Sequence, residues 1–177
     1  MNLDKNVPYY ILGIFLFLVF KLGFKYANHE DLIFLIKPTD TLISSLTGST
    51  SVYIENEGYY NNHLDILIDK SCAGFNFWVL SFLMIMFLLL KYAKSHLQRI
   101  ASIPVALLFT FVLTIIVNTS RIYVLIVAQN RLSSLLSIET TVIHESIGIL
   151  INLSFLIITY LILEKIIIKY KNHAKFA

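Results

Sequence analysis

Four long apolar runs constrain this chain more than any other feature, because about 20 mostly apolar residues are enough to cross a bilayer as a helix. The runs cover residues 8–24, 75–90, 100–118 and 144–163. Only Lys21 interrupts the first run, and the third stays apolar beyond Arg121 as far as Ala128. The 177-residue chain is 57% hydrophobic, whereas soluble domains are usually about 45–50% apolar. We therefore expect an all-α multi-pass membrane protein, a helical bundle of about four to six membrane helices.

Two shorter apolar runs, residues 32–36 and 42–46, are too brief to span a membrane. Lys37, Pro38 and Asp40 separate them. These runs are compatible with an interfacial or a re-entrant segment.

Positive charge indicates the orientation, because Lys and Arg concentrate in cytoplasmic loops. The second and fourth runs are each followed by basic residues: Lys91, Lys94 and Arg99, then Lys165, Lys169, Lys171 and Lys175. Residues 25–74 and 129–143 are then expected outside the cytoplasmic (inner) membrane. The net charge of +3 reflects this cytoplasmic bias. No basic patch is interleaved with aromatic residues, so we expect membrane lipid and no nucleic acid as a partner.

The outer segment before the second run has strand character. Residues 51–54 favour a strand, Glu57 and Gly58 favour a turn, and residues 63–69 partly alternate polar with apolar side chains. This pattern predicts a small extracytoplasmic β-hairpin. With no internal repeat and no long linker, residues 1–177 are expected to form a single integral membrane domain.

Three residues are expected at one membrane depth, near the outer boundary. Cys72 immediately precedes the second run, and His144 opens the fourth. A helix that starts inside at Ile100 rises roughly 27 Å by Asn118, and Arg121 follows one turn later. A thiol, a guanidinium and an imidazole at one depth are the components of a thiol-based acyl-transfer site.

Cys72 is the only cysteine of the chain, and it stands in a cluster of small residues, 71–74, that includes Gly74. A lone cysteine beside a membrane helix is usually a small buried hydrophobic residue. The small neighbours allow another backbone to approach closely, however. A thiol on the outer side without a disulfide partner in the chain is either intermolecular or reactive.

Arg121 has apolar residues on both sides, and a guanidinium at this depth is costly unless it is paired or near water. Snorkelling to lipid headgroups is the simpler explanation, but the apolar run that follows Arg121 disfavours it. Asn118 shares its helix face at a spacing of three and is a candidate to hold the guanidinium or a substrate backbone. Glu145 is the one acidic residue on the runs that is placed to neutralise Arg121.

His144 gains meaning beside a thiol, because a nearby imidazole lowers a thiol pKa and can carry a proton to a leaving amine. Gly148 and Asn152 follow at spacings of four and eight, which predicts a polar, small-residue stripe facing other helices. The sequence from His144 lacks the second histidine of a zinc-protease motif, since Gly148 stands there. We expect no metal and no organic cofactor.

The ordered set of motifs is similar to that of the exosortase/archaeosortase family. The set consists of Ser-Cys-Ala-Gly at residues 71–74, Asn-Thr-Ser-Arg at residues 118–121 and a downstream His144. Family members commonly have Cys-Ser-Gly, whereas this chain has Ala73 in the middle position. The short length resembles the subtype called exosortase K.

The resemblance implies a multi-pass membrane cysteine transpeptidase with Cys72, Arg121 and His144 as catalytic residues. It implies substrates that are secreted proteins with a C-terminal sorting signal, made of a short motif, a membrane helix and a basic tail. The active site would face the extracytoplasmic side. Two other classes stay open: a non-catalytic scaffold in which Arg121 pairs with Glu145, and a small transport or lipid-handling protein in which Arg121 faces an anionic headgroup.

Overall fold

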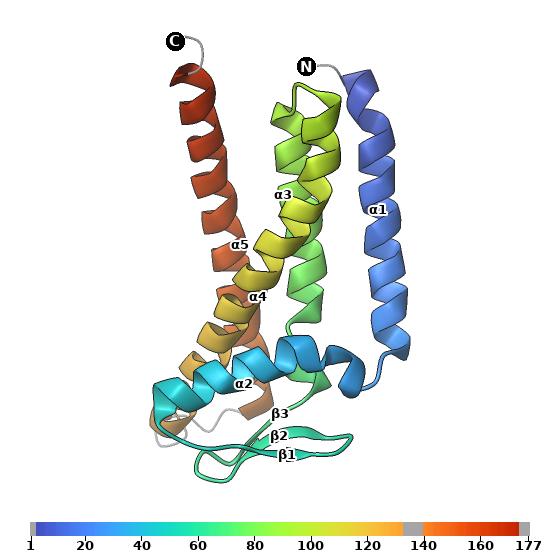
Figure 1. The fold of residues 1–177 in the computed structure, drawn as a ribbon. Coiled ribbons are helices and arrows are strands. Elements are labelled where there is room, and N and C mark those ends of the chain that lie inside the picture. Colours follow the sequence, from blue (N-terminus) through green and yellow to red (C-terminus); the bar gives the residue numbers. More distant parts are fainter. Residues whose placement is uncertain (1–2, 133–139, 174–177) are drawn as a thin grey trace.

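The protein is described by a computed structural model that covers the backbone of residues 3–132 and 140–173 and the side chains of residues 5–128 and 146–171. Five α-helices and three short strands make up most of this part of the chain. The helices are α1 Leu3–Tyr26, α2 Ile33–Thr47, α3 Phe75–Tyr92, α4 His96–Leu132 and α5 Thr140–His173. Helices α1, α3, α4 and α5 run along the length of the molecule, while α2 lies across one end with the strands beyond it (Figure 1).

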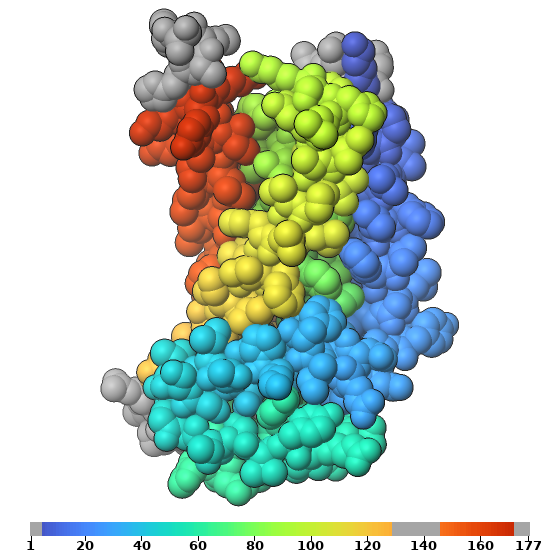
Figure 2. All heavy atoms as spheres, viewed as in Figure 1, coloured from blue at the N-terminus to red at the C-terminus, as the bar shows by residue number. Residues whose placement is uncertain are grey.

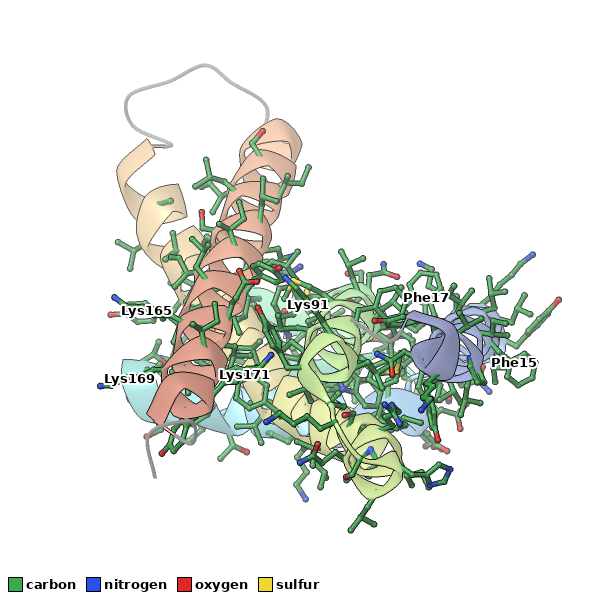
Figure 3. The ribbon with its side chains drawn as sticks, turned by 90° about the horizontal axis from the view of Figure 1, so that it is seen from above. Phe15, Phe17, Lys91, Lys165, Lys169 and Lys171 are labelled. Carbon is green, nitrogen blue, oxygen red and sulfur yellow. The ribbon has the colours of Figure 1, made fainter. Side chains whose placement is uncertain are left out.

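Four of the described helices are long and apolar enough to cross a membrane, which confirms the four apolar runs as helices. The candidate spans are Lys5–Tyr26, Lys70–Tyr92, His96–Ala128 and Ser146–Lys171. Their outward surfaces are apolar: Phe15 of α1 is 59% exposed and points away from the bundle (Figure 3). Such surfaces match lipid and would be unfavourable in water.

Helix α3 lies at the centre, between α1 and α5, and forms most of the core. Phe82, Ile85, Met86 and Leu90 of α3 are buried together with Ala106 of α4. Helix α1 approaches α3 closely at Gly13, where an added Cβ atom would lie 1.9 Å from Cε of Met86. The missing side chain at Gly13 therefore makes room for the Met86 side chain between α1 and α3.

Helix α2 is one continuous helix that joins the two short apolar runs through Pro38. Its inner side buries Leu35, Ile36 and Ile43, and the helix ends at Gly48, whose φ of 65° is left-handed. A helix of 15 residues is too short to span a bilayer. In Figures 1 and 2, α2 lies crosswise over the end of the bundle, between the membrane-length helices and the sheet. We call this end of the molecule the sheet end.

The expected hairpin is a three-stranded antiparallel sheet in the order β1-β2-β3. The strands are β1 Val52–Ile54, β2 Gly58–Asn61 and β3 Ile66–Ile68. Tyr59 pairs with Tyr53 on one side and with Ile68 on the other. The alternation seen in residues 63–69 therefore belongs to a third strand. Asn61 stabilises the second turn, since its Oδ1 accepts hydrogen bonds from the backbone N–H groups of His63 and Leu64.

Buried polar side chains join α2 to the sheet. Asp40 is 7% exposed and accepts a 2.6 Å hydrogen bond from the Ser51 hydroxyl. Asn61 donates to Ser49 Oγ at 2.6 Å. Loss of hydration raises the pKa of the Asp40 carboxyl above its usual value, and the bond from Ser51 opposes that rise.

The opposite end of the bundle carries both chain termini and the connection between α3 and α4 (Figure 1). Arg99 is 8% exposed, and its Nε donates to Asn6 Oδ1 at 2.6 Å. Asn6 in turn donates to the Leu90 carbonyl at 2.8 Å. Lys91 pairs with Glu164 of α5 at 2.9 Å. These contacts fasten α1, α3, α4 and α5 to one another at this end.

Candidate functional site

Cys72 lies in a short 3-10 turn, Lys70–Cys72, that Asp69 organises just before α3. The Asp69 carboxylate accepts hydrogen bonds from the backbone N–H groups of Ser71 at 2.9 Å and Cys72 at 3.2 Å. It also accepts a 2.5 Å bond from the Ser71 hydroxyl. The sequence analysis missed Asp69, although an aspartate two or three residues before a turn of N–H groups is a common capping signal. Cys72 itself is half-buried.

Gly74 separates the cysteine turn from α3 in a left-handed conformation, with φ of 69°. An added Cβ atom there would lie 3.1 Å from Cγ of Asn118 and 3.2 Å from Cγ2 of Thr114. The close approach expected from the small residues is thus present. What approaches Gly74 is a pair of α4 side chains rather than a backbone.

Asn118 links α4 directly to the cysteine turn. Its side chain is 3% exposed, and its Nδ2 donates to the backbone carbonyl of Cys72. A second, longer contact of 3.5 Å reaches Thr39 Oγ1 of α2. Asn118 therefore holds the cysteine turn, and the described hydrogen bonds do not connect it to the Arg121 guanidinium.

Arg121 lies one turn beyond Asn118 on α4, and Asn118 in turn bonds to the Cys72 carbonyl. Its Nε is buried and has no hydrogen-bond partner among the described residues. Helix α5 meets it at Gly148, where an added Cβ atom would lie 3.4 Å from Cδ of Arg121. Three elements, the cysteine turn, α4 and α5, thus converge at the sheet end. We call Cys72, Asn118 and Arg121 the thiol site.

His144 and Glu145 belong to the first turns of α5, but their side chains lie outside the described residues. His144 precedes Gly148 by four residues, so the two positions share a helix face. Gly148 contacts Arg121, so residue 144 lies on α5 one helical turn from that contact. Participation of His144 and Glu145 in the site stays a prediction.

A groove lies between α3 and α5 and reaches the first turn of α3. Its volume is about 260 Å³, and it is lined by Asn76, Phe77, Leu80, Ile149, Asn152, Leu153 and Leu156. Lys21 reaches it from α1 and donates a 2.6 Å hydrogen bond to Asn76 Oδ1. The sequence analysis placed Asn152 on a helix-facing stripe but missed Asn76 and the partner of Lys21. Their spacing of 55 residues gives no local signal.

The described residues contain no group of three or more His, Cys, Asp and Glu side chains that could hold a metal ion. The thiol site combines a thiol, a guanidinium and a buried amide. A thiolate attacks electrophilic carbonyl carbons, and a cation beside it stabilises negative charge on the oxygen. This combination is suited to acyl transfer.

Comparison of the chain with protein-family models, with curated proteins and with solved structures found no match. The fold and the site therefore define a class in physical terms alone. The chain is a mostly helical protein with four membrane-length helices and a small antiparallel sheet. At the sheet end, Asn118 of α4 bonds to the turn that carries the Cys72 thiol, and Arg121 lies one turn further along α4.

Proposed function

We propose that this protein is a membrane-embedded cysteine peptidase or transpeptidase that cleaves the C-terminal sorting signal of secreted proteins. The observation that supports the proposal is the hydrogen bond from Asn118 to the Cys72 carbonyl, 46 residues apart in the sequence, which places the cysteine turn one helical turn from Arg121 on α4. A cysteine that only filled space would need neither a capped turn nor an amide from another helix. An arginine among apolar helices is also energetically costly, and such residues usually have a functional role.

In the proposed reaction, the Cys72 sulfur attacks the carbonyl carbon of a peptide bond. His144 takes the thiol proton, and the carbonyl oxygen acquires the negative charge that Arg121 stabilises. The carbon–nitrogen bond then breaks, His144 returns the proton to the departing amine, and a thioester to Cys72 remains. An amine of an acceptor, or water, attacks the thioester and releases the thiol.

The order of the motifs supports the substrate class, because it is similar to the order in exosortases and archaeosortases. The proposal places the sheet end outside the cytoplasmic membrane, which puts the basic residues of the opposite end inside. A substrate tethered by its own membrane helix would then reach the thiol site by lateral diffusion in the bilayer. Asn118 has a positioning role in this scheme, since it fixes the turn that presents the thiol.

The test is substitution of the nucleophile in living cells. In cells that carry Cys72→Ala, secreted proteins with an apolar C-terminal helix and a basic tail should keep their tails, as seen by mass spectrometry of the envelope fraction. The loss should amount to several orders of magnitude in cleavage rate, because no other group can form the thioester.

Unchanged thermal unfolding of the purified Cys72→Ala protein is the control for folding. Unchanged tail removal in the Cys72→Ala cells would overturn the proposal. Loss of function in Arg121→Ala but not in Cys72→Ala would instead favour recognition of an anionic headgroup.

A further inference from the structure

The groove between α3 and α5 is open along its side. Leu80 on α3 is 49% exposed, and Ile149 and Leu153 on α5 are 68% and 54% exposed. Helices α1 and α5 stand on opposite sides of α3 (Figure 3), and the groove lies on the α5 side. Both groove walls belong to helices long enough to cross a membrane. The open side of the groove would therefore face lipid, and an occupant could enter it sideways.

Two amides interrupt this apolar surface, Asn76 on α3 and Asn152 on α5. Asn76 accepts a hydrogen bond from Lys21, which leaves its Nδ2 free to donate, and no described residue bonds to the Asn152 amide. Lipid tails cannot hydrogen-bond, so an unpaired amide facing them is unfavourable. Two such amides in one groove indicate an occupant with polar groups of its own.

The charge at the Asn76 end of the groove indicates which chemical groups an occupant would have. Lys21 is hydrogen-bonded to one of the amides, and none of the residues lining the groove is acidic. The groove therefore offers N–H donors and positive charge, which complement carbonyl oxygens. Among the peptide carbonyl oxygens in a membrane, those outside a helix are free to accept, because a helix satisfies its own backbone.

We propose that this groove binds the membrane-embedded segment of the peptide substrate, with its unwound residues paired to Asn76 and Asn152. The inference rests on the proposed function and deepens it by assigning the surface that holds the substrate. Asn76 lies in the first turn of α3, just beyond Gly74, so it stands at the end of the groove next to the cysteine turn. The amides replace the hydrogen bonds that a helix gives up when it unwinds for cleavage.

The test uses a synthetic probe with the full-length protein in liposomes. The probe is a 20-residue leucine–alanine helix preceded by a short peptide, whose N-terminal amine carries a chloroacetyl group as the thiol-reactive position. The Cys72 sulfur displaces chloride and forms a thioether, which mass spectrometry quantifies. Iodoacetamide, a small reagent that needs no groove, reports the reactivity of the thiol alone.

We expect Asn76→Leu and Asn152→Leu each to slow labelling by the helical probe about five- to tenfold, the equivalent of one lost hydrogen bond. Leu80→Trp should slow it by filling the groove. Ser154→Leu removes an exposed hydroxyl from α5 outside the groove and should leave the rate unchanged.

The two proposals fail in different ways. If wild-type Cys72 reacts with neither the probe nor iodoacetamide, the thiol is not a nucleophile and the proposed function is wrong. If the probe labels wild type, Asn76→Leu, Asn152→Leu and Leu80→Trp at one rate, the groove does not hold the substrate and only this inference is overturned. If the groove variants are labelled more slowly by the probe but at the wild-type rate by iodoacetamide, the inference is supported.

Discussion

Replacement of Asn118 by leucine should loosen the cysteine turn without opening a large cavity, because the two side chains are similar in volume. Asn118 is 3% exposed, and its amide is the described hydrogen-bond donor to the Cys72 carbonyl. Leucine cannot donate, so that carbonyl would lose its partner in a buried position. The longer contact to Thr39, at 3.5 Å, contributes little.

The expected loss of unfolding free energy in Asn118→Leu can be bounded by two sets of typical energies. An unsatisfied buried carbonyl costs about 1–3 kcal/mol, whereas hydrogen bonds between membrane helices average about 0.6 and reach about 1.7 kcal/mol. Because Asn118 lies where the helices meet the sheet and not at mid-bilayer, we expect Asn118→Leu to lower the free energy of unfolding by about 1–2 kcal/mol. Equilibrium unfolding in mixed detergent micelles, followed by circular dichroism, measures this difference.

Ser120→Ala is the matched control, since the Ser120 hydroxyl bonds only to the Ile116 carbonyl of its own helix among the described residues. It should change the free energy of unfolding by less than about 0.5 kcal/mol. If Asn118→Leu is as stable as Ser120→Ala, the amide does not hold the cysteine turn, and the positioning role assigned to Asn118 is wrong.

Three further predictions concern stability. Gly74→Ala should destabilise the protein by about 1–2 kcal/mol from its left-handed backbone alone, and more if Asn118 at 3.1 Å cannot move, as thermal unfolding would show. Asp40→Asn should stabilise the protein at pH 7 and make its stability depend less on pH. Burial raises the pKa of Asp40 in the folded state above its usual value of 3.8, so wild-type stability falls as the pH rises from that value through the folded-state pKa. A stability–pH curve that is the same in Asp40→Asn as in wild type would contradict this assignment. Asn6→Leu should lower stability by about 1–3 kcal/mol, because it removes the partners of the Leu90 carbonyl and of buried Arg99; an unfolding midpoint equal to wild type would exclude that role.

Hydropathy predicted the four long helices because each depends on a local property of the chain, a run of apolar residues of sufficient length. It did not predict that α2 is a single helix. Lys37, Pro38 and Asp40 suggested an interruption, but Lys37 points to the exposed side and Asp40 is satisfied by Ser51 of a neighbouring segment. The third strand was missed for a similar reason, since β3 has only three residues and depends on pairing with β2.

In the thiol site too, local features could be predicted from the sequence and contacts between segments could not. Residue type and spacing predicted that Cys72 and Arg121 would lie at one depth, which stays a prediction. The described link is the bond from Asn118, one turn before Arg121, to the Cys72 carbonyl. Spacing also suggested that Asn118 would face Arg121, because both are on one face of α4. The described hydrogen bond goes instead to the Cys72 carbonyl, which depends on how α3 begins against α4. Contacts between elements of this kind require the three-dimensional arrangement, as does the pairing of Lys21 with Asn76.

The bond from Asn118 to the cysteine turn has a mechanical consequence. It ties the cysteine turn before α3 to α4, so this turn and the stretch of α4 that carries Arg121 are held to each other. Helix α5 is the remaining wall of the groove, and its described polar anchors, Lys91 and Tyr92 bonded to Glu164, lie at the far end of the bundle. Because α5 also touches Arg121 at Gly148, a pivot of α5 about that distant anchor would change the width of the groove and the surroundings of the guanidinium together.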